Sequence, residues 1–500
     1  MKRRSLTHEA VDGIAWQSFA IGANIILRTI ILIILTRTLD PEDFGIIAAA
    51  MVIISVTTVL SEIGVARVLV QRLTLTPGIE KSAFAISILM GIGASLLIYF
   101  TAPLSARLFE MDKLVPYVEF LSLVLVINAV SIIAESLIQR ARRFRAMGLI
   151  ELGSFLAGFG FVALPLAQSG YGAWSLAIGY FVQCVVKLVA LLFAHPPKIG
   201  LWPREGTREL VTTGAGFMVG QVGNFVARQI DYLIVGRMLG ATSLGYYNRA
   251  YQFLMLPAQL FGTATAKVLF PSIASIQNEP ERVSRAYLRA LGQVAMLTLP
   301  ATGLLVVIAP ELVMTLFGEK WQEMIVPFQI LVLSLLFRTS YKISDSISLA
   351  MGSMYQRAWR QWIYAAAVAA GTFAGYRWGL AGVAVGVSTA VMLNFLIMTN
   401  LALAITKVPT RKVIAVHLRH ILIACGYSLL IWAAVTAARL QGWSDPVVLG
   451  IGLLVGLLLA ALIWFGLRGL LGADGKWLEQ LLRSRLPFLR SKSSDAKEAD

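Results

Sequence analysis

The sequence predicts an all-α, polytopic membrane protein, and three features lead to this fold class. First, 57% of the 500 residues are apolar or aromatic (AVILMFWYC) and only 14% are charged, whereas an average soluble domain has about 25% charged residues. Second, the mean hydropathy is +0.75. Third, the apolar residues form long runs of the length, about 20 residues, that a helix needs to cross a bilayer. One membrane-embedded body is therefore favoured over the set of soluble domains that this length would otherwise suggest.

About fourteen spans follow one another along the chain. They are expected near residues 13–35, 44–66, 82–103, 115–137, 148–168, 172–194, 210–236, 244–266, 287–309, 325–350, 359–376, 380–405, 415–438 and 446–468. The break at 168–172 (Gln-Ser-Gly-Tyr-Gly) is interpreted as a tight external turn, because a single bent helix there would reverse the orientation of every later span. After the last span, the segment 476–483 has the pattern of a short amphipathic helix on the inner surface, although a solvated tail fits it equally well.

The composition excludes several other classes of protein. The two cysteines, Cys184 and Cys425, lie inside apolar runs, so no disulfide framework is expected. No Gly-x4-Gly-Lys-Ser/Thr motif is present, so the chain has no ATPase site of that kind. No metal-ligand spacing is found either, and no cofactor is expected.

The net charge of +16 is explained by topology. If both termini are cytoplasmic, 30 of the 43 Lys and Arg residues fall in inner segments and seven in outer ones. This bias is the one that the positive-inside rule predicts for short loops. A nucleic-acid partner is not expected, because no soluble domain exists to bind one.

An internal duplication relates positions 200 residues apart. Asn24, Arg28, Arg37 and Gly45 coincide with residues of the same type at 224, 228, 237 and 245, without a gap. The shift carries the first span onto the seventh, and because this displacement of six spans is even, the two halves have the same orientation. We therefore expect parallel repeats related by a pseudo-two-fold axis along the membrane normal, with a substrate site between them.

A few ionisable residues remain within the spans, where they are costly and usually mark a pathway or a pair. The bases are Arg28, Lys187, Arg228, Arg249, Arg338 and Lys342; the acids are Asp231 and Asp345, with Glu62, Glu135 and Glu151 near inner helix ends. Several of these residues are spaced three or four positions from other polar residues, so that they form a polar stripe along one face of a helix. Such a stripe must face protein or water, because lipid cannot satisfy its hydrogen bonds. We expect a hydrated, cationic cavity lined by Asn24, Arg28, Asn224, Arg228, Arg249, Gln252, Arg338 and Lys342, with Asp231 and Asp345 as candidates for ion coupling.

Other roles for these charges remain open. Arg228 with Asp231, and Lys342 with Asp345, have the i,i+3 spacing of neutralised pairs that hold helices together. Arg249 lies near an outer helix end and is equally well explained as an interfacial residue, and Lys187 is expected to extend toward the inner surface. Arg28 has no acid within one turn, which favours a ligand role, and diphosphate is the anion that a guanidinium fork suits best.

The first outer turn, Leu39-Asp40-Pro41-Glu42-Asp43-Phe44-Gly45, and the later Glu62-Ile63-Gly64-Val65 resemble the polysaccharide-exporter (Wzx-type) branch of the multidrug/oligosaccharidyl-lipid/polysaccharide (MOP) flippase superfamily, with the colanic-acid-type exporters nearest. The resemblance implies two six-helix bundles around a central cavity and alternating access. It also implies an undecaprenyl-diphosphate-linked oligosaccharide as substrate in the bacterial inner membrane, with surrounding membrane lipids and a polysaccharide polymerase complex as further partners. Because no nucleotide site is found, transport is expected either to be coupled to a proton or sodium ion or to run downhill as polymer is removed.

The same resemblance suggests how the chain is divided. We expect an N-terminal bundle at 1–195, a cytoplasmic linker at 196–209, a C-terminal bundle at 210–406, two extra spans at 407–470 and a cytoplasmic tail at 471–500. The extra pair resembles that of the fourteen-span lipid II flippases, where additional helices form a groove for the polyprenyl tail.

Two rival functions belong to other classes. A polytopic glycan polymerase or ligase would need catalytic groups on a substantial outer loop, and the longest outer connection, near 310–324, offers no Asp-x-Asp motif or His-rich site. An ion-coupled drug antiporter of the same superfamily would require a net acidic cavity, whereas the in-span charges are net basic.

Overall fold

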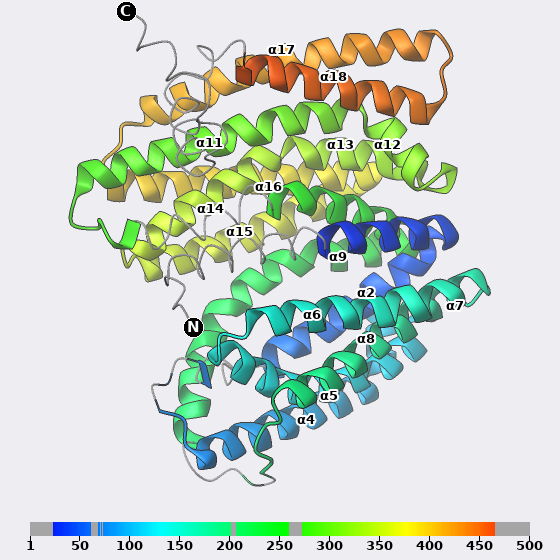
Figure 1. Ribbon diagram of the computed structural model, residues 1–500, viewed down its shortest axis with the longest axis vertical. Coiled ribbons are helices and arrows are strands. Elements are labelled where there is room, and N and C mark those ends of the chain that lie inside the picture. Colours follow the sequence, from blue (N-terminus) through cyan, green and yellow to red (C-terminus); the bar gives the residue numbers. More distant parts are fainter. Residues whose placement is uncertain are drawn as a thin grey trace, which may run out of the picture. The chain divides into compact units, whose positions relative to one another are not determined.

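The computed structural model describes residues 24–61, 69–70, 72, 74–200, 202, 207–259 and 273–465, apart from the side chains at 56–61, 208–224, 354 and 465. All regular elements in these ranges are helices, which confirms the predicted all-α class (Figure 1). Nine helices of the described part are long and apolar enough to cross a membrane. The exact number of fourteen spans stays a prediction.

The chain divides into two compact units. Unit 1 comprises Met1–Arg249, Leu316–Trp321 and Thr372–Val383, and unit 2 comprises Ala250–Thr315, Gln322–Gly371 and Ala384–Asp500. The long helix α9 (Thr207–Ala258) contributes to both, and its regular geometry is interrupted at Gly240, where φ is 83°. Only a residue without a Cβ adopts this conformation readily, and it falls between the seventh and eighth predicted spans.

Unit 1 begins with a helix over residues 24–38. Its further elements are α2 (Pro41–Ser61), α4 (Pro77–Phe109), α5 (Leu114–Arg140), α6 (Phe144–Phe155), the π-helix η1 (Leu156–Ala163), α7 (Leu164–Gln168), α8 (Ala173–Ala194) and the first part of α9. The long helices α4 and α5 run side by side (Figure 1), packed through residues such as Ile79, Ala83 and Ile133. The chain reverses between α7 and α8 through Gly170 and Gly172, both with positive φ, which confirms the turn predicted at 168–172.

The duplicated turns pack against each other within unit 1. A Cβ added to Gly45 would overlap the carbonyl oxygen of Ala241, and one added to Gly245 would overlap that of Pro41. Positions 41 and 241, like 45 and 245, are 200 residues apart, so the contact is reciprocal. This is the packing that an internal duplication with a pseudo-two-fold axis produces, and it explains why glycine stands at both positions.

Unit 2 contains the second half of the chain. Its elements are α11 (Pro280–Val307), α12 (Ala309–Leu316), η3 (Glu319–Met324), α13 (Ile325–Leu333), α14 (Leu335–Ala350), α15 (Met354–Gly375), η4 (Tyr376–Trp378), α16 (Gly379–Thr406), α17 (Thr410–Leu440) and α18 (Asp445–Phe465), some of whose residues at 316–321 and 372–383 belong to unit 1. A core cluster around Tyr287, Leu291 and Ile343 holds α11, α14 and the inner end of α17 together.

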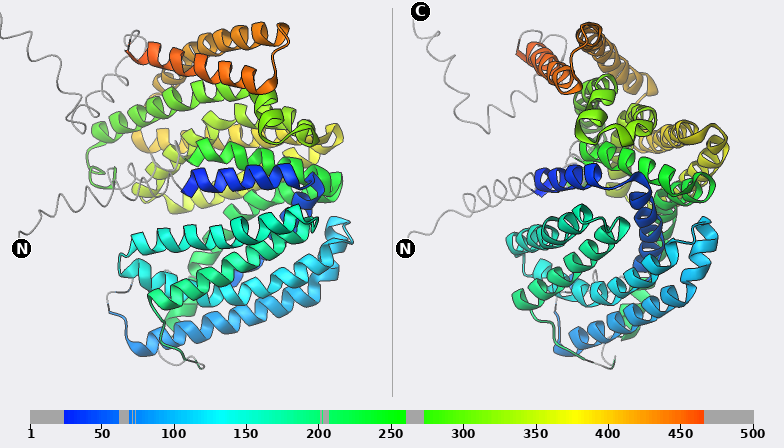
Figure 2. Two further views of the ribbon diagram at one scale, coloured as in Figure 1. Left: turned by 45° about the vertical axis from the view of Figure 1, so that its right-hand side comes forward. Right: turned by 90° about the vertical axis from the view of Figure 1, so that its right-hand side faces the viewer.

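The last two helices form a hairpin, α17 followed by α18, which appears in orange and red in Figure 2. Tyr427, Ile431 and Val435 bury one face of α17 against α11 and α18. Leu454, Leu457 and Leu458 of α18 are exposed. Apolar residues on this face are suited to lipid, where every backbone polar group is already bonded within the helix.

Candidate functional site

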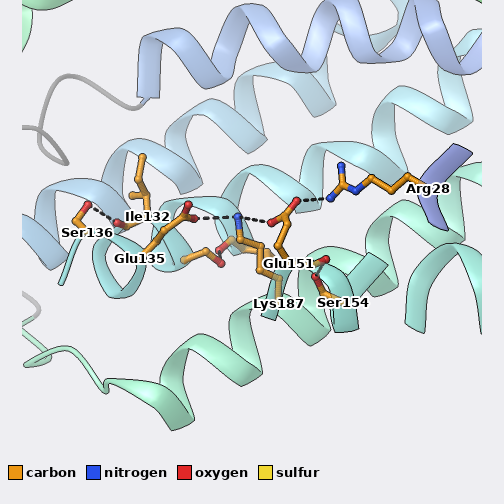
Figure 3. Close-up of polar contacts among 9 residues, drawn as sticks. Arg28, Ile132, Glu135, Ser136, Glu151, Ser154 and Lys187 are labelled. Carbon is orange, nitrogen blue, oxygen red and sulfur yellow. Dashed lines mark hydrogen bonds and ion pairs between the residues drawn. The ribbon is translucent and has the colours of Figure 1, made fainter. Parts of the chain in front are cut away.

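Four charged side chains from four helices of unit 1 form a chain of alternating sign (Figure 3). Arg28 Nη2 lies 2.5 Å from Glu151 Oε1, and Lys187 Nζ lies 3.5 Å from Glu151 Oε2. Lys187 Nζ also lies 2.9 Å from Glu135 Oε2. The four side chains are between 26% and 38% exposed. Glu151 is therefore shared between two cations, and Lys187 between two carboxylates.

Helical periodicity brings these groups to one cavity of about 660 Å³. On α5, Asn128, Ser131 and Glu135 step by 3 and 4 residues and line the same wall. On α8, Tyr180 lies two turns before Lys187 and lines the cavity with it. The cavity is thus polar on facing sides, as groups that lipid would leave unsatisfied must face protein or water.

The π-helix η1 forms the neighbouring wall. Phe155, the last residue of α6, stacks on Phe159 with ring centroids 5.0 Å apart, and the Arg28 guanidinium lies 4.7 Å from the Phe155 ring centroid. Gly158 lets the Gly179 carbonyl of α8 approach so closely that any Cβ would overlap it. Short π segments within α-helices often occur at functional sites, and here one supports the aromatic platform under Arg28.

Other predicted residues of unit 1 lie on the first helix and on α9. Asn24 is half-buried one turn before Arg28, and Arg228 is exposed. Asp231 is only 2% exposed and accepts a 2.7 Å hydrogen bond from the Tyr247 hydroxyl. The predicted alternative of an Arg228–Asp231 pair does not occur among the described contacts. The side chain of Asn224 lies outside the described residues.

Arg249 is buried rather than interfacial. It is 4% exposed, and its guanidinium lies 3.8 Å from the centroid of the Phe44 ring. A cation over an aromatic face is stabilised by the ring quadrupole. The side chain therefore packs against Phe44 of α2, next to the turn of the first repeat. Gln252, one turn further along α9, is exposed.

In unit 2, the predicted charges of α14 have different partners. Arg338 is 5% exposed, donates to the Tyr251 hydroxyl at 2.8 Å and donates to Ser334 Oγ at 3.0 Å. Asp345 forms a two-pronged ion pair with Arg357 of α15. The alternative of a Lys342–Asp345 pair is therefore wrong, because Arg357 of the next helix binds both carboxylate oxygens of Asp345. Lys342 is half-buried and has no ion pair within the described part of unit 2.

Sequence reasoning missed the central part of the network. Arg28 has no acid within one turn of its own helix, but Glu151, 123 residues away in the chain, reaches it from α6. Lys187 was expected to extend toward the inner surface, yet it bridges Glu135 and Glu151. The signal was present in the sequence, since two acids and two bases remained within or beside four neighbouring spans. In the cavity of unit 1, two basic side chains therefore face two acidic ones. The cationic cavity predicted between the two halves stays a prediction.

Comparison with known proteins places this geometry in context. Residues 34–326 match the family described as "Polysaccharide biosynthesis protein". The chain is 27% identical to the lipopolysaccharide biosynthesis protein WzxC of Escherichia coli (strain K12) over 345 residues, which cover 67% of this chain and 68% of that protein. It is 26% identical to the succinoglycan biosynthesis transport protein ExoT of Rhizobium meliloti (strain 1021), covering 62% of each chain. A solved structure titled lipid II flippase MurJ, inward closed conformation, superposes with a TM-score of 0.74 at 16% identity, covering 91% of this chain and 99% of that one.

These matches define the class first: a multi-pass membrane transporter, not an enzyme, with the fold of the structure titled lipid II flippase MurJ. The chain belongs to the polysaccharide biosynthesis protein family. The resemblance to the polysaccharide exporters, based on the first outer turn, is thereby confirmed.

Proposed function

We propose that the protein is a flippase that moves a polyprenyl-diphosphate-linked oligosaccharide from the inner to the outer leaflet of the bacterial inner membrane by alternating access. The observation that carries this proposal is the cavity of unit 1, which is lined by Arg28 of the first predicted span in a chain of the polysaccharide biosynthesis protein family. A guanidinium is the side chain that recognises phosphate oxygens in a fork geometry. The names of WzxC and ExoT, which refer to polysaccharide biosynthesis and transport, support the same substrate class.

The remaining features of the proposal follow from the sequence. The Lys and Arg bias supports cytoplasmic termini, and we propose the bundles 1–195 and 210–406 as the two halves that move relative to each other. Arg228 and Lys342 are proposed as further ligands of the diphosphate, since both lack an ion pair within the described part of the chain. Asp231 and Asp345 remain candidates for coupling to a proton or sodium ion. Asp345 is the weaker one, because Arg357 neutralises it.

The decisive experiment compares a deletion strain with complemented strains. Loss of the protein should leave lipid-linked oligosaccharide accumulating on the inner leaflet, because synthesis continues there without transport. Wild type should restore export, and Arg28→Ala should not, although its amount in the membrane stays normal. Full export by Arg28→Ala would overturn the role of this residue, and the absence of accumulation in the deletion strain would overturn the flippase assignment.

A second candidate function is an ion-coupled drug antiporter of the same superfamily. The ion-pair network supports this candidate, because Glu135 and Glu151 line the cavity with the carboxylates that an organic cation would need. The two functions differ in their substrates, so the deletion strain distinguishes them. An antiporter predicts greater sensitivity to lipophilic cations with normal polysaccharide export, whereas the flippase predicts the reverse.

A further inference from the structure

Arg28 is already occupied by an anion of the protein itself. Its Nη2 atom contacts the Glu151 carboxylate at 2.5 Å, and its Nε atom is buried without a hydrogen-bond partner among the described residues. A guanidinium can donate two parallel hydrogen bonds to one anion. Glu151 uses only one donor of that pair. The bond to Glu151 therefore leaves room for a ligand that uses both Nε and Nη2.

Glu151 is held in a way that permits its displacement. Its side chain is 38% exposed, and its other oxygen lies near Lys187 Nζ. When the carboxylate leaves Arg28, it retains that second cation and does not become an isolated buried charge, which would be costly. An ion pair of this exposure adds little to stability, because solvent screens it. An incoming anion thus needs only a modest advantage over the carboxylate.

Diphosphates and phospholipid phosphodiesters differ in how well they can replace the Glu151 carboxylate at Arg28. Arg28 and Lys187 contact opposite oxygens of the same carboxylate, so they lie close enough for one diphosphate to bridge them. A diphosphate has two phosphorus centres and about two negative charges, whereas the phosphodiester of an ordinary phospholipid has one of each. The diphosphate gains contacts that offset the loss of the Arg28–Glu151 pair, and the phosphodiester does not.

We propose that Glu151 is a specificity-determining residue, an internal counter-anion that keeps Arg28 from binding the single phosphodiesters of surrounding phospholipids and yields only to a diphosphate. This inference rests on the proposed function, since it takes Arg28 as the site for the diphosphate. Glu151 acts through Arg28 and is a positioning residue.

The test uses the full chain in phosphatidylcholine nanodiscs, with geranylgeranyl diphosphate as the binding probe and phosphatidylglycerol as the competitor. Phosphatidylglycerol should not weaken binding of the probe to wild type. In Glu151→Gln, the probe should bind about ten-fold more tightly, the equivalent of about 1.4 kcal/mol, and phosphatidylglycerol should now compete. Asp112→Asn is the control, because it also removes one carboxylate charge, but Asp112 is exposed and does not line the cavity; it should retain the selectivity of wild type.

Further variants keep the outcomes distinct. Glu151→Asp shortens the side chain by one methylene and keeps its charge, so it should lose part of the selectivity even if Glu151→Gln does not fold. Equal selectivity in wild type, Glu151→Gln and Glu151→Asp would overturn this proposal while leaving the flippase assignment intact. Unchanged probe binding by Arg28→Ala would instead remove the diphosphate site on which it rests.

Discussion

Two regions of unit 1 use arginines of the same duplicated helix in opposite ways. Arg28 pairs with the half-exposed carboxylate of Glu151 beside a cavity. Arg37, nine residues further along, donates through Nε to the backbone carbonyl of Leu316 at 2.9 Å, at the end of α12. A ligand can replace a carboxylate, but it cannot replace a helix-end carbonyl unless the helix moves away. The group that an arginine contacts, and not the arginine itself, thus decides whether it can serve as a binding site or only as a structural contact.

The second repeat shows the same division. Arg228 is exposed, whereas Arg237 donates to the carbonyls of Leu108 at 2.8 Å and Arg107 at 3.3 Å, at the end of α4. Arg37 therefore caps a helix of the second half of the chain, and Arg237 caps a helix of the first. A cation at a helix C-terminus is stabilised by the unpaired carbonyls there. These crossed caps, together with the Gly45 and Gly245 contacts, hold together the turn regions of the two repeats, which the predicted topology makes their outer ends.

The strongest way to break the outer region is Gly45→Ala. The new Cβ would overlap the backbone of Ala241, which cannot move aside as a flexible side chain can. Overpacking of this kind costs about 3 kcal/mol, so we expect a lower Tm by differential scanning fluorimetry and loss of export. Gly93→Ala is the control, because a Cβ on Gly93 of α4 meets no atom within 4 Å. A normal Tm for Gly45→Ala would mean that the outer ends do not pack as described.

A cross-link tests whether these outer ends separate during transport. Lys320 Nζ contacts Asp40 Oδ1 at 2.7 Å and joins the two halves of the sequence. In a background without Cys184 and Cys425, Asp40→Cys with Lys320→Cys, joined by a cleavable bifunctional thiol reagent, should abolish export while leaving the protein folded. Reductive cleavage of the reagent should restore it.

The matched control for that cross-link lies within the first repeat. Lys113 Nζ contacts Glu42 Oε1 at 2.8 Å, with similar exposure. Glu42→Cys with Lys113→Cys, treated in the same way, should leave export intact because both residues belong to the same half. Equal effects of the two cross-links would show that the reagent, and not the joining of the halves, stops transport.

Removing one crossed cap should have a smaller effect. Arg37→Met loses a charge-assisted hydrogen bond to Leu316, a contribution of about 1.5 kcal/mol. We expect a Tm a few degrees lower and reduced but measurable export, since Trp321 still donates to the Thr36 carbonyl at 2.8 Å. Arg107→Met, another cation near the outer end of α4 whose side chain is exposed, should leave both quantities unchanged.

The helices and turns of this structure could be predicted from the sequence, whereas the side-chain contacts between helices could not. Hydropathy located the helices and the turn at 168–172, and the register of Gly45 with Gly245 indicated the duplication before any contact was known. The partners of Arg28 and Asp345 were not predicted, because they come from other helices, 123 residues away for Glu151 and 12 for Arg357. Spacing along one helix identifies only i,i+3 and i,i+4 neighbours, so these pairings needed the fold. The π-helix η1 has no sequence signal that we recognise.

The smallest effect is expected from the exposed pair of Glu42 and Lys113, whose side chains are 45% and 74% exposed. The hydrogen bond from Lys113 to Glu42 raises the pKa of the Lys113 ammonium above its ordinary value of 10.5. A group with a raised pKa contributes its stabilisation below its ordinary pKa and loses it only as the pH rises through the higher one. The pair is therefore charged throughout the physiological range, yet solvent screens it. Lys113→Met should leave Tm and export at wild-type levels at pH values of about 6 to 8, and so should Lys320→Met, whose partner Asp40 is also exposed. If Lys320→Met alone lowered Tm, the contact between the halves would depend on this ion pair and not on the glycines and the crossed arginine caps.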